Sequence, residues 1–151
     1  MARIELEMMV QVPPEACYAL ALNVQAHLAS TLQTGERVVA GPADGQLKLG
    51  DVVTWEARHL GIRQRLTVRI SAATPPHHFR DEMVRGAFRT LRHDHYFEAV
   101  PGGTRVRDIF EFSSPLGFVG RWFDKLFLKR YLTRFLRARN AMLKQQLEQN
   151  R

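Results

Sequence analysis

The chain has 151 residues, of which 45% are hydrophobic and 25% are charged. This composition excludes a disordered chain and predicts one domain, over residues 1–151, with a sizeable core. The single cysteine, Cys17, excludes an internal disulfide and any metal site built from several cysteines. No apolar run approaches the ~20 residues that a membrane span needs and no signal peptide is recognisable, so we expect a cytoplasmic protein.

The net charge of +7 belongs to one C-terminal segment. Residues 117–151 contain nine lysines and arginines against two acidic residues, and the rest of the chain is neutral. Such a segment is either a solvated helix face or a surface for an anionic partner, such as anionic membrane. Nucleic acid is disfavoured, because no recognition motif or row of stacking aromatic residues accompanies the charge.

Hydrophobic periodicity and turn residues predict the order of strands and helices. Alternation predicts a first strand over 3–12, followed by two short helices over 15–22 and 24–32. Six more strands are predicted, over 36–40, 51–59, 62–72, 78–85, 88–100 and 104–113. A long helix over about 116–147 ends the chain, with Pro115 at its start.

Alternation also predicts which strand residues face each other. The tight turn at 60–61 places Ala57 opposite Gln64 on the apolar side. The turn at Gly86 places Asp81 beside His93. The turn at 101–103 allows two registers, with Asp108 opposite either His95 or Phe97, and in both its carboxylate reaches His95.

A strip of polar side chains therefore lies on an otherwise apolar sheet face, formed by Gln64, Asp81, His93, His95 and Asp108. Buried ionisable groups need partners, so one interpretation is a pair of core histidines that each bind a carboxylate. In another, the strip orients the polar end of a ligand in a cavity. The same His–Asp pairs could also act as general acid or base. We expect no metal site, because a clear third ligand is absent, and no cofactor.

The predicted C-terminal helix has two apolar stripes that are rotated relative to each other. The first contains Phe118, Trp122, Phe123 and Phe127, and the second runs from about residue 128 to 147. One straight helix cannot bury both against one sheet unless the sheet wraps far around it. We therefore predict a break near residues 124–129, with the first stripe covering a cavity mouth or contacting a membrane or protein partner, a second copy of the chain included.

The chain resembles the START-like superfamily, also called SRPBCC, which includes the polyketide cyclase/dehydrase and lipid-transport proteins. The resemblance covers nearly the whole chain and is sharpest in five stretches: Gly50–Ala57, Gly61–Thr67, Pro76–Phe88, His93–Glu98 and Gly102–Asp108. It implies an α+β helix-grip fold, in which a curved antiparallel sheet of about seven strands wraps around the long C-terminal helix. Two short helices lie between the first two strands. It also implies that Gln64, Asp81, Gly86, His93 and Asp108 occupy recurring positions.

This fold implies an apolar chamber between the sheet and the long helix. We expect it to bind or transport a hydrophobic small molecule or lipid. A cyclase/dehydrase-like enzyme and a membrane- or protein-docking module are the alternatives. Candidate catalytic residues are His93, His95, Asp108 and Asp81. The expected lining comprises Trp55, Gln64, Leu66, Asp81, Met83, Leu91, His93, His95, Asp108, Phe110, Phe123 and Phe127. Ligand entry is expected between the first helical segment and the loops at 41–50 and 101–103.

Overall fold

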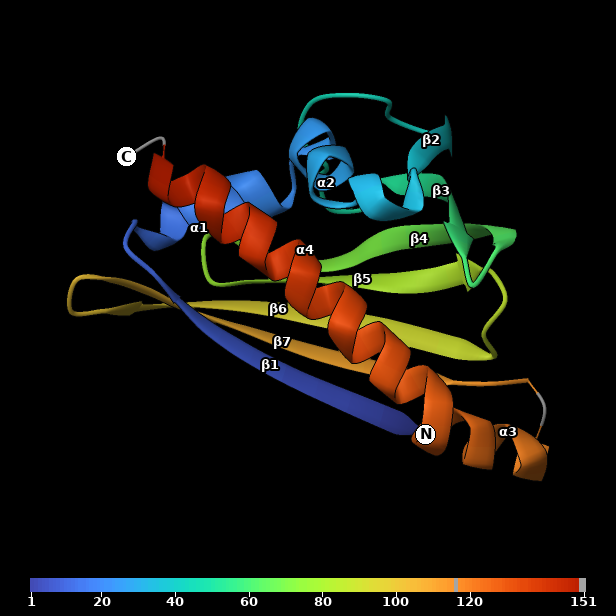
Figure 1. Ribbon diagram of the computed structural model, residues 1–151. Helices are drawn as coiled ribbons and strands as arrows, with labels where there is room; N and C mark the ends of the chain where they lie inside the picture. The colour runs from blue at the N-terminus through green and yellow to red at the C-terminus, as the bar shows by residue number, and fades with distance from the viewer. Residues whose placement is uncertain (116, 150–151) are drawn as a thin grey trace.

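In the computed structural model, a seven-stranded antiparallel sheet curves around a long C-terminal helix (Figure 1). The structure describes residues 1–115 and 117–149, and the side chains of residues 118, 121, 124 and 125 are outside this description. The strands are β1 (Ala2–Val10), β2 (Arg37–Ala40), β3 (Val52–His59), β4 (Ile62–Thr74), β5 (His78–Arg85), β6 (Thr90–Val100) and β7 (Gly103–Ser113). The predicted fold class is confirmed.

Two short helices, α1 (Pro14–Ala21) and α2 (Val24–Ser30), connect β1 to the rest of the sheet, with a 3-10 turn, η1 (Leu32–Thr34), before β2. Pro13 precedes α1, and Pro14 occupies its first turn, where a missing N–H is tolerated. Asn23 caps α2, because its side chain accepts a hydrogen bond of 2.9 Å from the backbone N–H of Ala26.

The strand order is β1-β7-β6-β5-β4-β3-β2. The registers predicted across the β3–β4 and β5–β6 turns are confirmed, and the β6–β7 turn has one of its two predicted registers. Across the β3–β4 turn, Ala57 pairs with Gln64. Asp81 lies opposite His93. His95 lies opposite Asp108, which selects one of the two registers that the sequence allowed.

The C-terminal helix is interrupted where its apolar stripe changes phase, as predicted. It consists of α3 (Gly117–Phe123), a π-helical segment η2 (Asp124–Leu128) and α4 (Lys129–Gln149). α4 crosses one face of the sheet diagonally, next to α1 and α2 (Figure 1). It buries Leu132, Leu136 and Leu147.

Five apolar side chains of α3 and η2 are exposed instead, whereas Leu128, the last residue of η2, is half-buried and lines the cavity. Trp122 and Leu126 are 61% and 65% exposed. The side chain of Phe118, which was assigned to the same stripe, lies outside the described residues.

The core comprises two apolar clusters. One contains Phe97 and Val106 and lies under α1 and α2, and the other contains Leu91 and Phe110 and lies under the first half of α4. On β6, two histidines separate Leu91 from Phe97, and on β7 Asp108 separates Val106 from Phe110. The polar strip therefore lies between the clusters. Among the described residues, no helix is both long and apolar enough to cross a bilayer.

Candidate functional site

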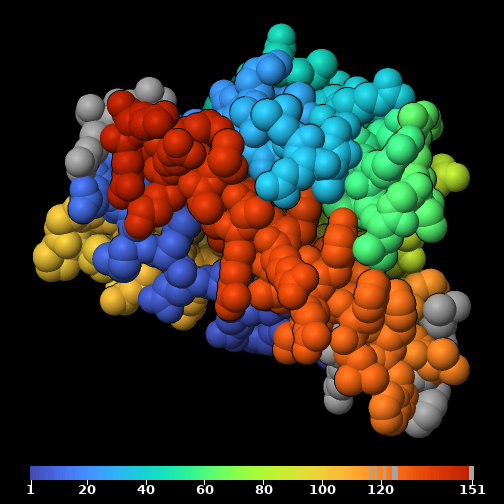
Figure 2. All heavy atoms as spheres, viewed as in Figure 1, coloured from blue at the N-terminus to red at the C-terminus, as the bar shows by residue number. Residues whose placement is uncertain are grey.

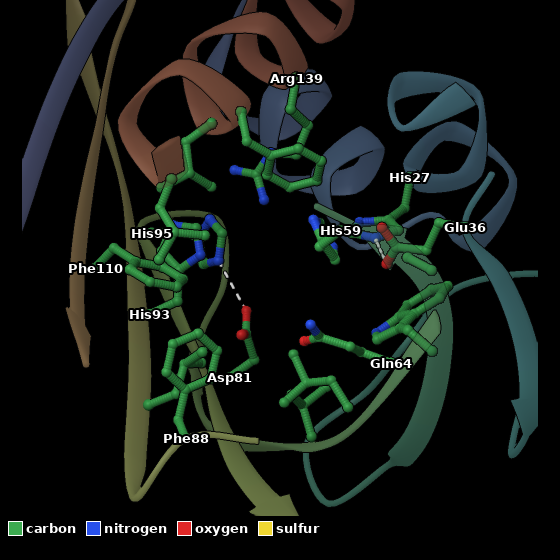
Figure 3. Close-up of a pocket in the computed structure, with 18 of the residues that line it drawn as sticks. His27, Glu36, His59, Gln64, Asp81, Phe88, His93, His95, Phe110 and Arg139 are labelled. Carbon is green, nitrogen blue, oxygen red and sulfur yellow. Dashed lines mark hydrogen bonds and ion pairs between the residues drawn. The ribbon is translucent and has the colours of Figure 1, made fainter. Parts of the chain in front are cut away.

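A cavity of about 200 Å³ lies between the sheet, α2 and α4 (Figure 3). Most of its wall is apolar, with aromatic and aliphatic side chains from the sheet and from α4. For comparison, a closed apolar cavity of about 150 Å³ is large enough for a benzene ring. The cavity therefore has room for a molecule of about one ring, but not for a diacyl lipid.

Two histidine rings form part of the cavity wall. His93 and His95 project from the same face of β6, and their rings stack with centroids 3.8 Å apart. Phe79 stacks on the other side of His95 at 4.1 Å, and Phe110 meets His93 edge-on at 5.1 Å. Because rings enclose both imidazoles, their orientations are fixed by packing as well as by hydrogen bonds.

Asp108 lies behind the two imidazoles and holds both of them. Its Oδ1 is 2.9 Å from His93 Nε2 and 3.1 Å from His95 Nδ1. Its Oδ2 accepts a hydrogen bond of 2.7 Å from the Asn140 side chain on α4. Asp108 is 2% exposed and faces a second cavity of about 30 Å³, which is roughly the volume of one water molecule. The prediction that Asp108 lines the main cavity is therefore wrong, since the stacked rings cover it.

Asp81 pairs with His95 from the neighbouring strand and lines the main cavity. Its Oδ2 is 2.9 Å from His95 Nε2, and its side chain is 22% exposed. Both ring nitrogens of His95 therefore face carboxylate oxygens, one on each side. A neutral imidazole has only one N–H, so this arrangement favours the doubly protonated ring.

The pKa values of the two histidines and the two aspartates follow from these contacts. Burial opposes the charged form of His95, but its hydrogen bonds to Asp108 and Asp81 outweigh burial and raise its pKa. Burial, followed by the positive charge of His95, lowers the pKa of His93 to about 4. Burial alone would raise the pKa of Asp81 and of Asp108, yet the facing histidines lower the first and bring the second well below its ordinary value. These shifts favour a protonated His95 beside a neutral His93, with both aspartates ionised.

Arg139 on α4 adds a second buried cation. Its Nη2 is 3.6 Å from Asp108 Oδ1 and donates a hydrogen bond of 3.2 Å to Asn140 Oδ1. Its Nε is buried and lacks a hydrogen-bond partner among the described residues. The guanidinium projects into the cavity in Figure 3. With His95 protonated, the formal charges of Asp81, Asp108, His95 and Arg139 sum to zero, and the buried cluster is then neutral as a whole.

A second polar group lies across the cavity from the histidine pair (Figure 3). His27 Nε2 is 2.8 Å from Glu36 Oε1, and the His27 ring stacks on Trp55 at 4.2 Å. His59 Nδ1 is 2.9 Å from the hydroxyl of Tyr131. All five side chains line the cavity. Of these, only Trp55 was expected in the lining.

The remaining predicted residues divide into two groups. Trp55, Gln64, Leu66, Leu91 and Phe110 line the cavity together with Asp81 and the two histidines. Phe123 and Phe127 do not, because they lie on α3 and η2 and are 42% and 48% exposed. Met83 is also outside the lining, and its sulfur packs towards Gly86.

The predicted entrance is partly wrong. Leu47, from the loop at 41–50, lines the cavity, whereas the β6–β7 turn at 101–103 lies at the far end of the sheet (Figure 1). The exposed lining residues are instead Leu60 and Arg65, in the β3–β4 hairpin, and Ala87, in the β5–β6 loop. These two segments form the solvent-facing end of the cavity wall.

The fold is shared with solved structures of low sequence identity. TTHA0849 from Thermus thermophilus is 18% identical, with 97% of each chain covered and a TM-score of 0.78. A START superfamily protein from Mycobacterium smegmatis is 12% identical, with 99% of each chain covered and a TM-score of 0.74. Major latex-like protein 151 from Panax ginseng is 13% identical, with 96% of each chain covered and a TM-score of 0.70.

These likenesses show a shared fold, that of START-like proteins, in which a curved antiparallel sheet wraps around a long C-terminal helix. The chain belongs to the family described as polyketide cyclase / dehydrase and lipid transport, which it matches over residues 1–148. No curated protein matches it. The family therefore indicates a protein that binds hydrophobic ligands or a cyclase/dehydrase-like protein.

Proposed function

We propose that the chain binds a small, largely apolar molecule with one polar substituent in the cavity between the sheet and α4. The observation that supports this proposal is the composition of the wall, which is apolar except for polar side chains at defined places. The volume of about 200 Å³ favours a molecule of about one ring over a lipid with long acyl chains.

The polar substituent is expected near Asp81, Arg139 and Gln64. Asp81 and Arg139 already belong to a neutral buried cluster, so a ligand hydroxyl or carbonyl adds hydrogen bonds without burying a new charge. The side-chain amide of Gln64 has no hydrogen-bond partner among the described residues and lines the cavity, so it can donate to or accept from a ligand.

Native mass spectrometry of the purified protein, followed by denaturation, tests for a retained guest. Titration with benzyl alcohol, followed by the fluorescence of Trp55, measures binding of a ring-sized probe. We expect Ala57→Phe to abolish probe binding, because Ala57 is buried and lines the cavity. Ala141→Phe is the matched control, since Ala141 is exposed on α4. Equal probe affinity in both variants would refute the proposal.

Acid–base catalysis by the same residues is the alternative. A general base or acid works best with a pKa near the working pH. Here the pKa of His93 is lowered to about 4, away from neutral pH, whereas that of His95 is raised by its two carboxylate partners. The lowered pKa disfavours His93 as a general acid or base at neutral pH. A turnover that is lost in His93→Gln while probe affinity is kept would reverse this preference.

A second candidate function is peripheral contact with an anionic membrane. Five exposed apolar side chains form a patch on α3 and η2, at one corner of the molecule (Figure 2): Val119, Trp122, Phe123, Leu126 and Phe127. The exposed cations Lys129, Arg130 and Arg134 follow directly on α4. Apolar side chains for the acyl region next to cations for phosphate headgroups are what such a contact requires.

Vesicles test this second candidate. We expect Trp122 fluorescence to shift to the blue with phosphatidylserine-containing vesicles and much less with pure phosphatidylcholine. Raising the salt to about 1 M should weaken the contact, because the Debye length falls to about 3 Å. Absence of binding together with a dimeric mass in sedimentation would instead assign the patch to a second copy of the chain.

A further inference from the structure

We propose that Asp81, His93 and His95 form a binding site for a divalent transition-metal ion at the wall of the cavity. Each of the three side chains offers one ligand atom, and these atoms all lie within 4.8 Å of one another. This site shares Asp81 with the proposed ligand site, but binding of an ion is tested without the organic ligand. It also revises the sequence expectation, because Asp81 supplies the third ligand.

The spacing of the ligand atoms suits a small ion. His95 Nε2 and Asp81 Oδ2 are 2.9 Å apart. Two ligand atoms at about 2.1 Å from one ion and 2.9 Å from each other subtend an angle of about 90° at that ion. At a tetrahedral angle two such bonds place their ligand atoms about 3.4 Å apart, so a pair of ligand atoms at the 4.8 Å limit has to close by about 1.4 Å. Ion binding therefore requires the His93 side chain to move towards the other two ligands.

Asp108 lies where the outer carboxylate of a metal site is found. Histidine ligands usually donate their second ring N–H to a carboxylate or carbonyl, which fixes the tautomer and orientation of the ring. Asp108 Oδ1 is within hydrogen-bond distance of two ring nitrogens, His93 Nε2 at 2.9 Å and His95 Nδ1 at 3.1 Å. These contacts leave His93 Nδ1 and His95 Nε2 as the nitrogens for an ion. Asn140 holds the other oxygen of Asp108 at 2.7 Å.

The charge of the site indicates what completes the coordination. An ion replaces the proton on His95 Nε2, because a ligating nitrogen must be deprotonated. The divalent ion then offsets Asp81 and Asp108, and the charge of Arg139 remains. Three protein ligands leave at least one position open towards the cavity. An anionic fourth ligand, such as hydroxide or a carboxylate, therefore restores neutrality.

The donor set selects the class of ion. Two imidazole nitrogens and one carboxylate suit Zn²⁺, Co²⁺ or Fe²⁺, whereas Ca²⁺ and Mg²⁺ prefer oxygen ligands alone. Zn²⁺ and Co²⁺ are therefore the probes of choice, and Mg²⁺ is the negative control.

The experiment uses the full chain without an affinity tag, stripped with EDTA and dialysed. Calorimetric titration with Zn²⁺ should give one ion per chain, and Mg²⁺ should give no heat. Zinc X-ray absorption of the wild type should report two histidine nitrogens, a readout that needs no variant. Asp81→Asn should weaken Zn²⁺ binding by at least about 100-fold, and Asp108→Asn by about 10–100-fold.

The matched control is His78→Gln. His78 forms another His–Asp pair, with Nε2 2.7 Å from Asp94 Oδ1, but it is not in the cavity wall. Its substitution should leave Zn²⁺ affinity unchanged. Failure of the wild type to bind Zn²⁺ stoichiometrically would overturn the proposal, as would equal affinities in Asp81→Asn and His78→Gln. Benzyl alcohol binding to the EDTA-treated protein is scored separately, so the ligand proposal can survive failure of the metal proposal.

Discussion

Replacing Asp108 by asparagine tests whether one carboxylate organises the polar strip. The substitution keeps the shape of the side chain but removes its negative charge. Asp108 faces donors on His93, His95 and Asn140, and Arg139 is 3.6 Å away. An asparagine has one acceptor oxygen, and its amide N–H groups would face at least one of these donors. His95 and Arg139 would also lose a buried counter-charge.

Removing one partner of a buried ion pair costs about 3–5 kcal/mol. We therefore expect Asp108→Asn to lower the free energy of unfolding by about that amount. For a chain of this size the melting temperature should fall by about 6–20 °C. The measurement is equilibrium urea unfolding at pH 6.5, followed by circular dichroism. This loss is a large share of the roughly 5–15 kcal/mol that stabilises a typical domain.

Asp44→Asn is the control, because Asp44 is exposed in the β2–β3 loop and a surface change there should stay within about 0.5 kcal/mol. A loss of less than about 1 kcal/mol in Asp108→Asn, with the fold intact, would show that the contacts of Asp108 are not coupled as described.

Three further outcomes are expected. The free energy of unfolding should fall by up to about 3 kcal/mol from pH 6.5 to 4, because the unfolded chain protonates His93 in this range while the folded chain, in which the pKa of His93 is about 4, does not. In urea unfolding at several pH values, His93→Gln should reduce this dependence on pH. An unchanged slope would contradict a lowered pKa for His93. Gly103→Ala should destabilise more than Gly35→Ala, since its Cβ would overlap the Val10 carbonyl whereas Gly35 has open space, and equal melting temperatures would refute this. Cys17 is 2% exposed, and burial raises the pKa of its thiol. It should therefore react with iodoacetamide far more slowly in the native than in the urea-unfolded protein. Equal rates would contradict its burial.

Much of the fold could be predicted because strand registers depend on local information. A two-residue turn fixes which residues pair, and alternation fixes which side faces inward, so the β3–β4 pairing follows from the sequence. The break in the C-terminal helix was predictable for a similar reason, since a phase change between two apolar stripes is visible at 100° per residue.

The cavity was harder to predict because its wall depends on how separate elements meet. Arg139 lies about 180° around α4 from the exposed Arg130, on the side of Leu132 and Leu136, and this signal was present in the helical periodicity. It was missed because Arg139 was counted with the basic segment. The pairing of His59 with Tyr131 had no comparable signal, since it joins residues from a strand and a helix that are distant in sequence.

The π-helical segment η2 has a consequence for the direction in which the exposed aromatic residues point. A π turn contains about one residue more than an α turn. If the same five residues, Asp124–Leu128, wound as regular α-helix, the extra residue would rotate α3 by about 100° relative to α4. Trp122 would then point away from its present direction, although no apolar residue had been exchanged for a polar one. The π winding of this segment thus determines where the molecule displays its aromatic corner.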